Sequence, residues 1–161
     1  MLRRLTIASV LLTGAMAIGP AALADDEYNV SVGITAAGAP LGLHGVDPVA
    51  FLNSGNQVEG AAAHTSIHDG VAYYFASAGN KAEFDADPTA YLPQNGGFCT
   101  FGVSVGKKFD GDPAYAAIVD QKLYVFLNEE IFKAFNKDRS GTIAKAAMNW
   151  PTIRSTPVED L

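Results

Sequence analysis

The chain contains a single cysteine, Cys99, which lies in the glycine- and aromatic-rich stretch 96–102. One cysteine cannot form a disulfide within the chain, and the sequence has neither a CxxC pair nor a CxxCH haem-attachment motif. The fold must therefore be held by an apolar core, for which aromatic residues along the chain supply the material. Cys99 itself is a buried spectator, an intermolecular bridge, a reactive thiol or a metal ligand, and the sequence leaves these roles open.

Residues 1–24 have the pattern of a secretory signal peptide. Two arginines precede an apolar run from residue 5 to about residue 18, and Ala22-Leu23-Ala24 places small residues at the −3 and −1 positions of a cleavage site. The apolar run is shorter than the roughly 20 residues that span a bilayer. We expect cleavage near Ala24, a periplasmic or secreted location, and no membrane span in the mature protein.

The mature chain is acidic. Removing Arg3 and Arg4 from the 11 basic residues leaves 9 against 17 acidic ones, a net charge near −8. Such a surface repels phosphate backbones and anionic lipids, so we expect no nucleic-acid partner. The sequence has no phosphate-cradling glycine loop, nucleophile elbow or paired-carboxylate motif. It therefore indicates no nucleotide, haem or flavin cofactor and no hydrolase of the usual kinds.

Local signals predict helices grouped around two hairpins. The fold class is therefore α+β: a small antiparallel sheet of two hairpins covered by short helices. No tandem repeat is evident, because the two hairpins differ in their flanks. The expected elements are a short helix after Asp47-Pro48, strands over 57–68 and 71–76 joined by Asp69-Gly70, a helix over 78–86 capped by Ser77, a turn from Asp87-Pro88 to Leu92, a short helix or turn near Cys99, strands over 115–119 and 122–127, a helix capped by Asn128, and a last helix over 141–149 that ends at Trp150-Pro151.

The mature chain, residues 25–161, has 137 residues, which predicts one domain with its own core. Residues 25–42 are rich in alanine and glycine and lack a clear period, so we expect a flexible lead-in with a short edge strand. The domain proper is expected over 43–151. Residues 152–161 are expected to form a loose C-terminal tail.

The three histidines are candidate imidazole ligands. His64 and His68 would share a helix face about 6 Å apart, but on the predicted strand they lie about 13 Å apart, too far to bind one ion. At most one, preferably His64 facing Phe75, is a candidate partner of Cys99. His44 is the other candidate. For each of them, an ordinary core or surface histidine is the competing interpretation.

Two interpretations of Cys99 compete. A helix that begins after Gly97 would place the thiol at a helix N-terminus, where its pKa is lowered and the thiolate is favoured. Alternatively, Cys99 is a small buried hydrophobe between Phe98 and Phe101, because free cysteine is among the most buried residue types.

Several blocks of the chain resemble the exported branch of the YHS-domain family. The resemblance covers about 43–151 and implies a metal-binding domain. Some exported relatives carry selenocysteine at the position matching Cys99, which implies a chemically used thiol. The chain lacks the early cysteine of the transporter-linked relatives, so their multi-thiol site is not carried over. The matching blocks are Gly45-Val46-Asp47-Pro48-Val49-Ala50-Phe51, Tyr74-Phe75-Ala76-Ser77-Ala78-Gly79-Asn80 with Phe84, Asp87-Pro88 with Tyr91-Leu92-Pro93-Gln94, Gly96-Gly97-Phe98-Cys99, and Leu123-Tyr124 with Asn149-Trp150-Pro151.

The leading functional hypothesis is copper or zinc binding, with Cys99 as thiolate ligand and His64 or His44 as imidazole ligand. Such a site is incomplete and needs water, a carboxylate or a second chain. One alternative is a thiol redox protein in which Cys99 cycles with an external partner thiol. Another is a non-catalytic structural or partner-binding module. The metal and redox hypotheses both require a sulfur that is reachable and ionisable.

Overall fold

The structure is a computed structural model that describes residues 27–161, so the expected signal peptide and its cleavage near Ala24 lie outside the described residues. It confirms the α+β class. No helix within these residues is long and apolar enough to cross a bilayer. The elements are η2 (Leu43–Gly45), α2 (Pro48–Ser54), β1 (Ala61–His68), β2 (Val71–Phe75), α3 (Ala78–Ala86), α4 (Pro88–Tyr91), η3 (Gln94–Gly97), α5 (Thr100–Ser104), β3 (Asp112–Val119), β4 (Lys122–Phe126), α6 (Glu129–Lys137), α7 (Arg139–Ile153) and η4 (Val158–Asp160).

The two hairpins form two separate antiparallel sheets of two strands each, rather than the single sheet that we expected. Asp69-Gly70 joins β1 to β2, and Asp120-Gln121 joins β3 to β4, as predicted. All four turn residues have positive φ, 48° and 80° in the first turn and 51° and 59° in the second. Two consecutive residues with positive φ match the twist of the flanking strands, which explains the tight connections.

The first hairpin has a bulge that changes the predicted register. Ser66 pairs with Tyr73 as expected, but Phe75 pairs with Ala61 rather than with His64. The extra residues of β1 lie between positions 61 and 65, where the strand bends away from its partner. The prediction that His64 faces Phe75 is therefore wrong.

The domain consists of two units with the same design, so the prediction that the chain has no tandem repeat is wrong. Pairing between positions 61 and 75 in the first hairpin recurs 51 positions later, between positions 112 and 126, with a bulge at the same point. Helices α3 and α6 each have 9 residues and also start 51 positions apart, after the capping side chains of Ser77 and Asn128. We call residues 43–91 the first unit and residues 94–153 the second unit.

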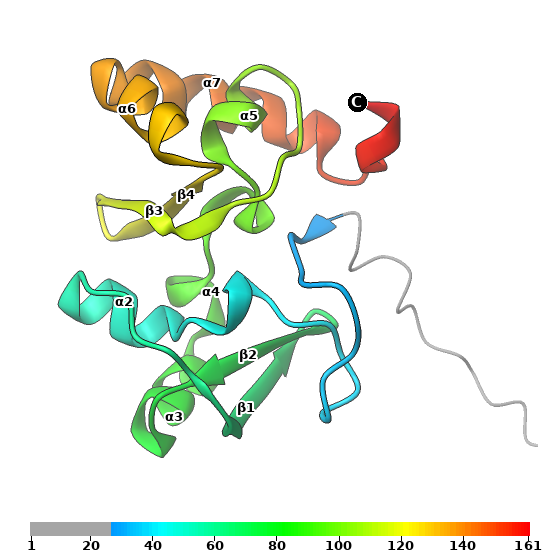
Figure 1. Ribbon diagram of the computed structural model, residues 1–161, viewed down its shortest axis with the longest axis vertical. Coiled ribbons are helices and arrows are strands. Elements are labelled where there is room, and N and C mark those ends of the chain that lie inside the picture. Colours follow the sequence, from blue (N-terminus) through cyan, green and yellow to red (C-terminus); the bar gives the residue numbers. More distant parts are fainter. Residues whose placement is uncertain (1–26) are drawn as a thin grey trace, which may run out of the picture.

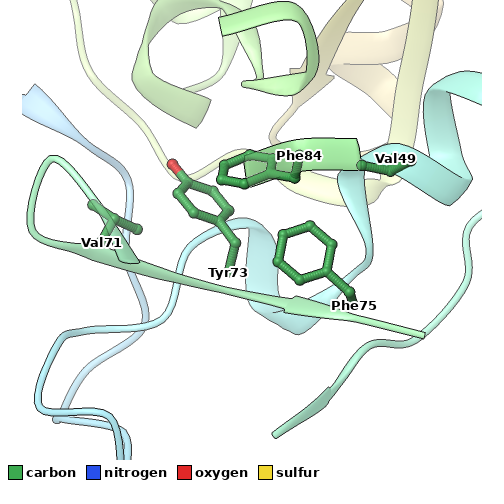
Figure 2. Close-up of a cluster of buried hydrophobic side chains, with 5 residues drawn as sticks. All are labelled: Val49, Val71, Tyr73, Phe75 and Phe84. Atoms are coloured by element: carbon green, nitrogen blue, oxygen red, sulfur yellow. The ribbon is translucent and has the colours of Figure 1, made fainter. Parts of the chain in front are cut away.

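The two units share few side chains, which is why the repeat is hard to see in the sequence. The conserved pattern is the core of each hairpin and its helix. Figure 2 shows this core in the first unit, where Phe84 of α3 packs on Tyr73 and Phe75 of β2. The aromatic residues that are identical at an offset of 51 are Tyr73 and Tyr124, Phe75 and Phe126, and Phe84 and Phe135.

The units are stacked head to tail. Hairpin β3–β4 of the second unit lies on the turn η2 and helix α2 of the first, so α2 sits between the two hairpins (Figure 1). At the other end of the stack, α7 covers α5, where Ala146 and Ile153 pack with Phe98 and Val103. The first contact buries apolar surface between the units and joins them into one body, whereas the second contact lies within the second unit.

Helix α7 continues to Ile153 instead of ending at Trp150-Pro151 as we predicted. Proline removes one helix hydrogen bond, but Ile153 is buried and holds the last turn against the second unit. Beyond it, Leu161 packs on the same cluster. The segment 152–161, expected to form a loose tail, thus lies against the domain.

The lead-in segment also lies against the domain. Asn29 N donates to Gly96 O at 2.8 Å, and Ala72 N of β2 donates to Pro40 O at 2.8 Å. Near the other end of the chain, Arg154 Nη2 lies 2.7 Å from Glu27 Oε2. These contacts bring the two ends of the described chain together.

Candidate functional site

A left-handed turn presents Cys99 to the core. Asn95, Gly96 and Gly97 of η3 have φ values of 55°, 62° and 82°. Gly96 also lies against the carbonyl of Glu27 so closely that no side chain would fit there. The chain then extends through Phe98, and Cys99 is the N-cap residue of α5, which confirms the prediction that a short helix begins there.

The sulfur of Cys99 lies inside the second unit. Cys99 is 1% exposed and packs in a cluster with Tyr124, Phe126 and Phe135. Its backbone N donates to Phe109 O at 2.9 Å, which fixes the residue to the segment before β3. The sequence-based interpretation of Cys99 as a small buried residue among aromatic rings matches this environment.

Burial raises the pKa of the Cys99 thiol above its ordinary value. Backbone hydrogen bonds from Gly102, Leu127 and Phe101 lower the pKa in part, and the charge of Asp110 raises it further. The prediction of a lowered pKa is therefore wrong. The five-residue helix α5 and its neighbours do supply donors, but desolvation of the thiolate outweighs them.

Asp47 is the counterpart of Cys99 in the first unit. It follows the left-handed turn η2, it is fully buried, and it is the N-cap of α2. Its Oδ1 accepts hydrogen bonds from Val49 N and Ala50 N, both at 2.9 Å. Its Oδ2 accepts from Ala76 N at 2.8 Å and from Asn80 Nδ2 at 2.7 Å. One carboxylate thus ties the start of α2 to the segment after β2.

The sulfur of Cys99 occupies the place of that carboxylate. The backbone N–H groups that lower the pKa of the thiol belong to Phe101, Gly102 and Leu127. The first two stand 52 positions after the donors in α2, and the third stands 51 positions after the donor that follows β2. In the second unit the thiol therefore stands at the position of the capping side chain, near N–H groups of α5 and of the segment after β4, but it makes no capping hydrogen bond to α5.

The structure does not gather the predicted metal ligands. No three histidine, cysteine, aspartate or glutamate side chains among residues 27–161 form a group that could hold a metal ion. Cys99 lies in the core of the second unit, whereas His64 is on β1 of the first unit. His44 instead contacts a carboxylate: its Nε2 lies 3.0 Å from Asp110 Oδ1.

Asp110 was not identified from the sequence. It lies 66 positions from His44, in the segment between the second unit's α5 and β3, and no local pattern links the two residues. Asn29 Nδ2 donates to the same Asp110 oxygen at 2.7 Å. His44 has a φ of 50°, so a strained backbone holds the imidazole beside this carboxylate.

Comparisons of the chain with protein-family models, with curated proteins and with solved structures find no match. The resemblance to the exported YHS-domain family stays a prediction.

Proposed function

We propose that the protein is a non-catalytic interaction module built from two stacked units, in which Cys99 is a structural residue. The observation that carries this proposal is the position of Cys99: it is the buried N-cap residue of α5, as Asp47 is of α2, and it packs among aromatic rings. Asp47 is a capping residue with all its hydrogen bonds inside the fold. A structural role at the equivalent position accounts for the burial of Cys99.

Burial of the sulfur disfavours the thiol chemistry. A thiol exchanges with an external partner, or binds a soft metal, as a thiolate that the partner can reach. Cys99 is 1% exposed, and burial raises the pKa of its thiol. A partner thiol would have to open the aromatic cluster of the second unit before it could attack.

Alkylation by iodoacetamide tests the structural role. We expect native Cys99 to react about a hundredfold more slowly than Cys99 in denaturant, because reaction requires opening of the second unit. A Val105→Cys variant in a Cys99→Ser background is the control, since Val105 is 61% exposed. Native Cys99 that reacts as fast as this surface cysteine would refute the proposal.

Transition-metal binding is a second candidate function, favoured by one specific contact. His44 Nε2 and Asp110 Oδ1 lie 3.0 Å apart, close to the spacing of two ligands on one zinc ion, about 3.3 Å for bonds of about 2.0 Å. Such a site would take copper or zinc and leave positions for water or a second chain. In this version a carboxylate replaces the thiolate of the original hypothesis.

Metal titration of the mature protein by calorimetry separates the two versions. If His44 and Asp110 hold the ion, then His44→Asn and Asp110→Asn lose the tightest site, while Cys99→Ser and His64→Asn keep it. Loss of binding in Cys99→Ser alone would instead support the hypothesis that the Cys99 thiolate binds the metal. Equal binding in all four variants and the wild type would end both versions.

A further inference from the structure

We propose that the outer face of hairpin β1–β2 is a docking surface for a protein that presents an apolar turn and short helix like η2 and α2. This inference rests on the proposed interaction function and names its surface. The inference comes from the repeat. In the second unit, the outer face of hairpin β3–β4 covers a turn and a short helix, and hairpin β1–β2 has the equivalent face.

The internal contact between the units is the template. Hairpin β3–β4 turns its inner face to the second unit's core and its outer face to the first unit. There the outer face buries the apolar side of η2 and α2, which carries Leu43, Val46 and Phe51. The outer-face residues in this contact are Ala116, Ile118, Leu123 and Val125.

The first hairpin has the same register, so the same positions form its outer face. Counting back 51 positions gives Thr65, Ile67, Ala72 and Tyr74. Their neighbours in sequence, such as Tyr73 and Ser66, are buried on the inner side, as alternation along a strand requires.

This outer face has no unit stacked on it within residues 27–161, and hairpin β1–β2 lies together with α3 at the lower end of the molecule in Figure 1. Ile67 is 53% exposed, and Thr65 and Tyr74 are half-buried. Ala72 is buried because residues 40–42 pair with β2, with Gly42 N donating to Ala72 O at 2.9 Å. The outer face is therefore a small apolar surface, and residues 40–42 cover its edge along β2.

The occupant is a different polypeptide rather than a second copy. In a second copy, η2 and α2 are already covered by hairpin β3–β4. The corresponding surface of its second unit, η3 and α5, is covered by α7. A partner must therefore carry an uncovered unit, with apolar side chains on a turn and a short helix.

A synthetic peptide of residues 41–55 is the probe, because it contains the apolar turn and helix that the internal contact uses. We expect the fluorescently labelled peptide to bind the mature protein saturably in anisotropy titrations. Ile67→Asp should weaken this binding about tenfold or more, since it places a charge against apolar side chains. Val105→Asp, at an exposed position near the other end of the stack, should leave it unchanged.

Amide chemical shifts locate the peptide. Shifts confined to β1 and β2, lost in a Phe51→Asp peptide, are the expected result. The proposal is overturned by absence of saturable binding, by equal binding to Ile67→Asp, or by shifts centred on β3–β4. It is also overturned if the mature protein self-associates through Ile67. None of these results depends on thiol reactivity, so the structural role of Cys99 stands or falls separately in the alkylation experiment.

Discussion

At the scale of single residues, the two units have different side chains at the same position, the N-cap of a short helix. A short helix begins after a left-handed turn, and its first N–H groups and the segment after the hairpin need a common acceptor. Asp47 supplies two carboxylate oxygens that accept these hydrogen bonds, whereas Cys99 places a sulfur there that makes no capping hydrogen bond to α5. Sulfur accepts hydrogen bonds weakly, but it suits the aromatic cluster around it better than a charge would.

Asp47→Ala should be among the most destabilising single changes in the chain. It leaves several buried donors without their acceptor, so we expect a loss of about 3 kcal/mol in the free energy of unfolding. Asp87→Ala is the matched control, because Asp87 also precedes a proline but makes no capping hydrogen bond to α4. Urea unfolding of the two variants checks the difference, and equal losses would contradict the capping role.

Substitutions of Cys99 distinguish a cap from a plain apolar residue. A serine hydroxyl would offer the nearby backbone N–H groups of Phe101, Gly102 and Leu127 a stronger acceptor than sulfur, whereas alanine offers none. We expect Cys99→Ala to be less stable than Cys99→Ser by about 1 kcal/mol in urea unfolding. If Cys99 acted only by filling apolar space, the order of the two variants would be reversed.

At the scale of elements, the two hairpin turns provide a matched pair. The first turn has glycine at its second position, Gly70, whereas the second has Gln121 with a φ of 59°. A left-handed conformation costs a side-chain-bearing residue about 1 kcal/mol more than glycine. We expect Gln121→Gly to stabilise the protein by about this amount and Gly70→Ala to destabilise it similarly. Thermal unfolding of both variants checks the signs, and the same sign in both would refute the explanation.

The elements that sequence predicted best are those fixed by their own residues. Ser77 and Asn128 cap the helices that follow them, and Asp69-Gly70 makes the expected turn, because these signals act over three or four positions. The contact of His44 with Asp110 depends on how the units stack, so no local pattern announces it. The burial of Cys99 depends on aromatic residues from β4 and α6 for the same reason.

The bulge and the repeat escaped sequence analysis for related reasons. A register is predicted from the turn outward, and the bulge in β1 interrupts that count before Phe75. The repeat preserves backbone geometry and a few aromatic positions, while most other side chains differ. The spacing of Tyr73, Phe75 and Phe84 recurs in the second unit, as do Ile67 and Asp69 at the same offset, and this was the signal that could have revealed the repeat.

At the scale of the whole molecule, α7 closes one end of the stack. Ile153 lies in its last turn and is 8% exposed. We expect Ile153→Ala to cost about 3 kcal/mol, as for other buried large-to-small changes. Val158→Ala, at a position that is 45% exposed, should change stability by less than about 0.5 kcal/mol. Urea unfolding compares the two, and a small effect at Ile153 would favour the loose tail expected from sequence.

The contact of Glu27 with Arg154 and Ser155 should be visible in the pH dependence of stability. Hydrogen bonds from Arg154 and Ser155 lower the pKa of Glu27 below its ordinary value. The unfolded chain then binds more protons, so the contribution of Glu27 is complete above its unfolded pKa of about 4.5 and is lost as the pH falls through the lower native value.

Glu27→Gln should therefore flatten the decline in stability between about pH 5 and pH 3. Urea midpoints measured across this range for wild type, Glu27→Gln and the surface variant Glu159→Gln test the expectation. A decline that stays as steep in Glu27→Gln as in the wild type would show that the contacts of Glu27 with Arg154 and Ser155 add nothing to the free energy of unfolding.

The contact of Glu27 with Arg154 also means that the order of the elements along the chain can be changed by circular permutation. A short linker could join the two ends of the described residues, and new termini could be opened at the Asp120-Gln121 turn, because neighbouring ends favour circular permutation. In such a protein the polypeptide would start within one hairpin and finish within the same hairpin, and every buried contact between the units would be retained. The order of synthesis, and with it the order in which the two halves become available to fold, would then be under experimental control.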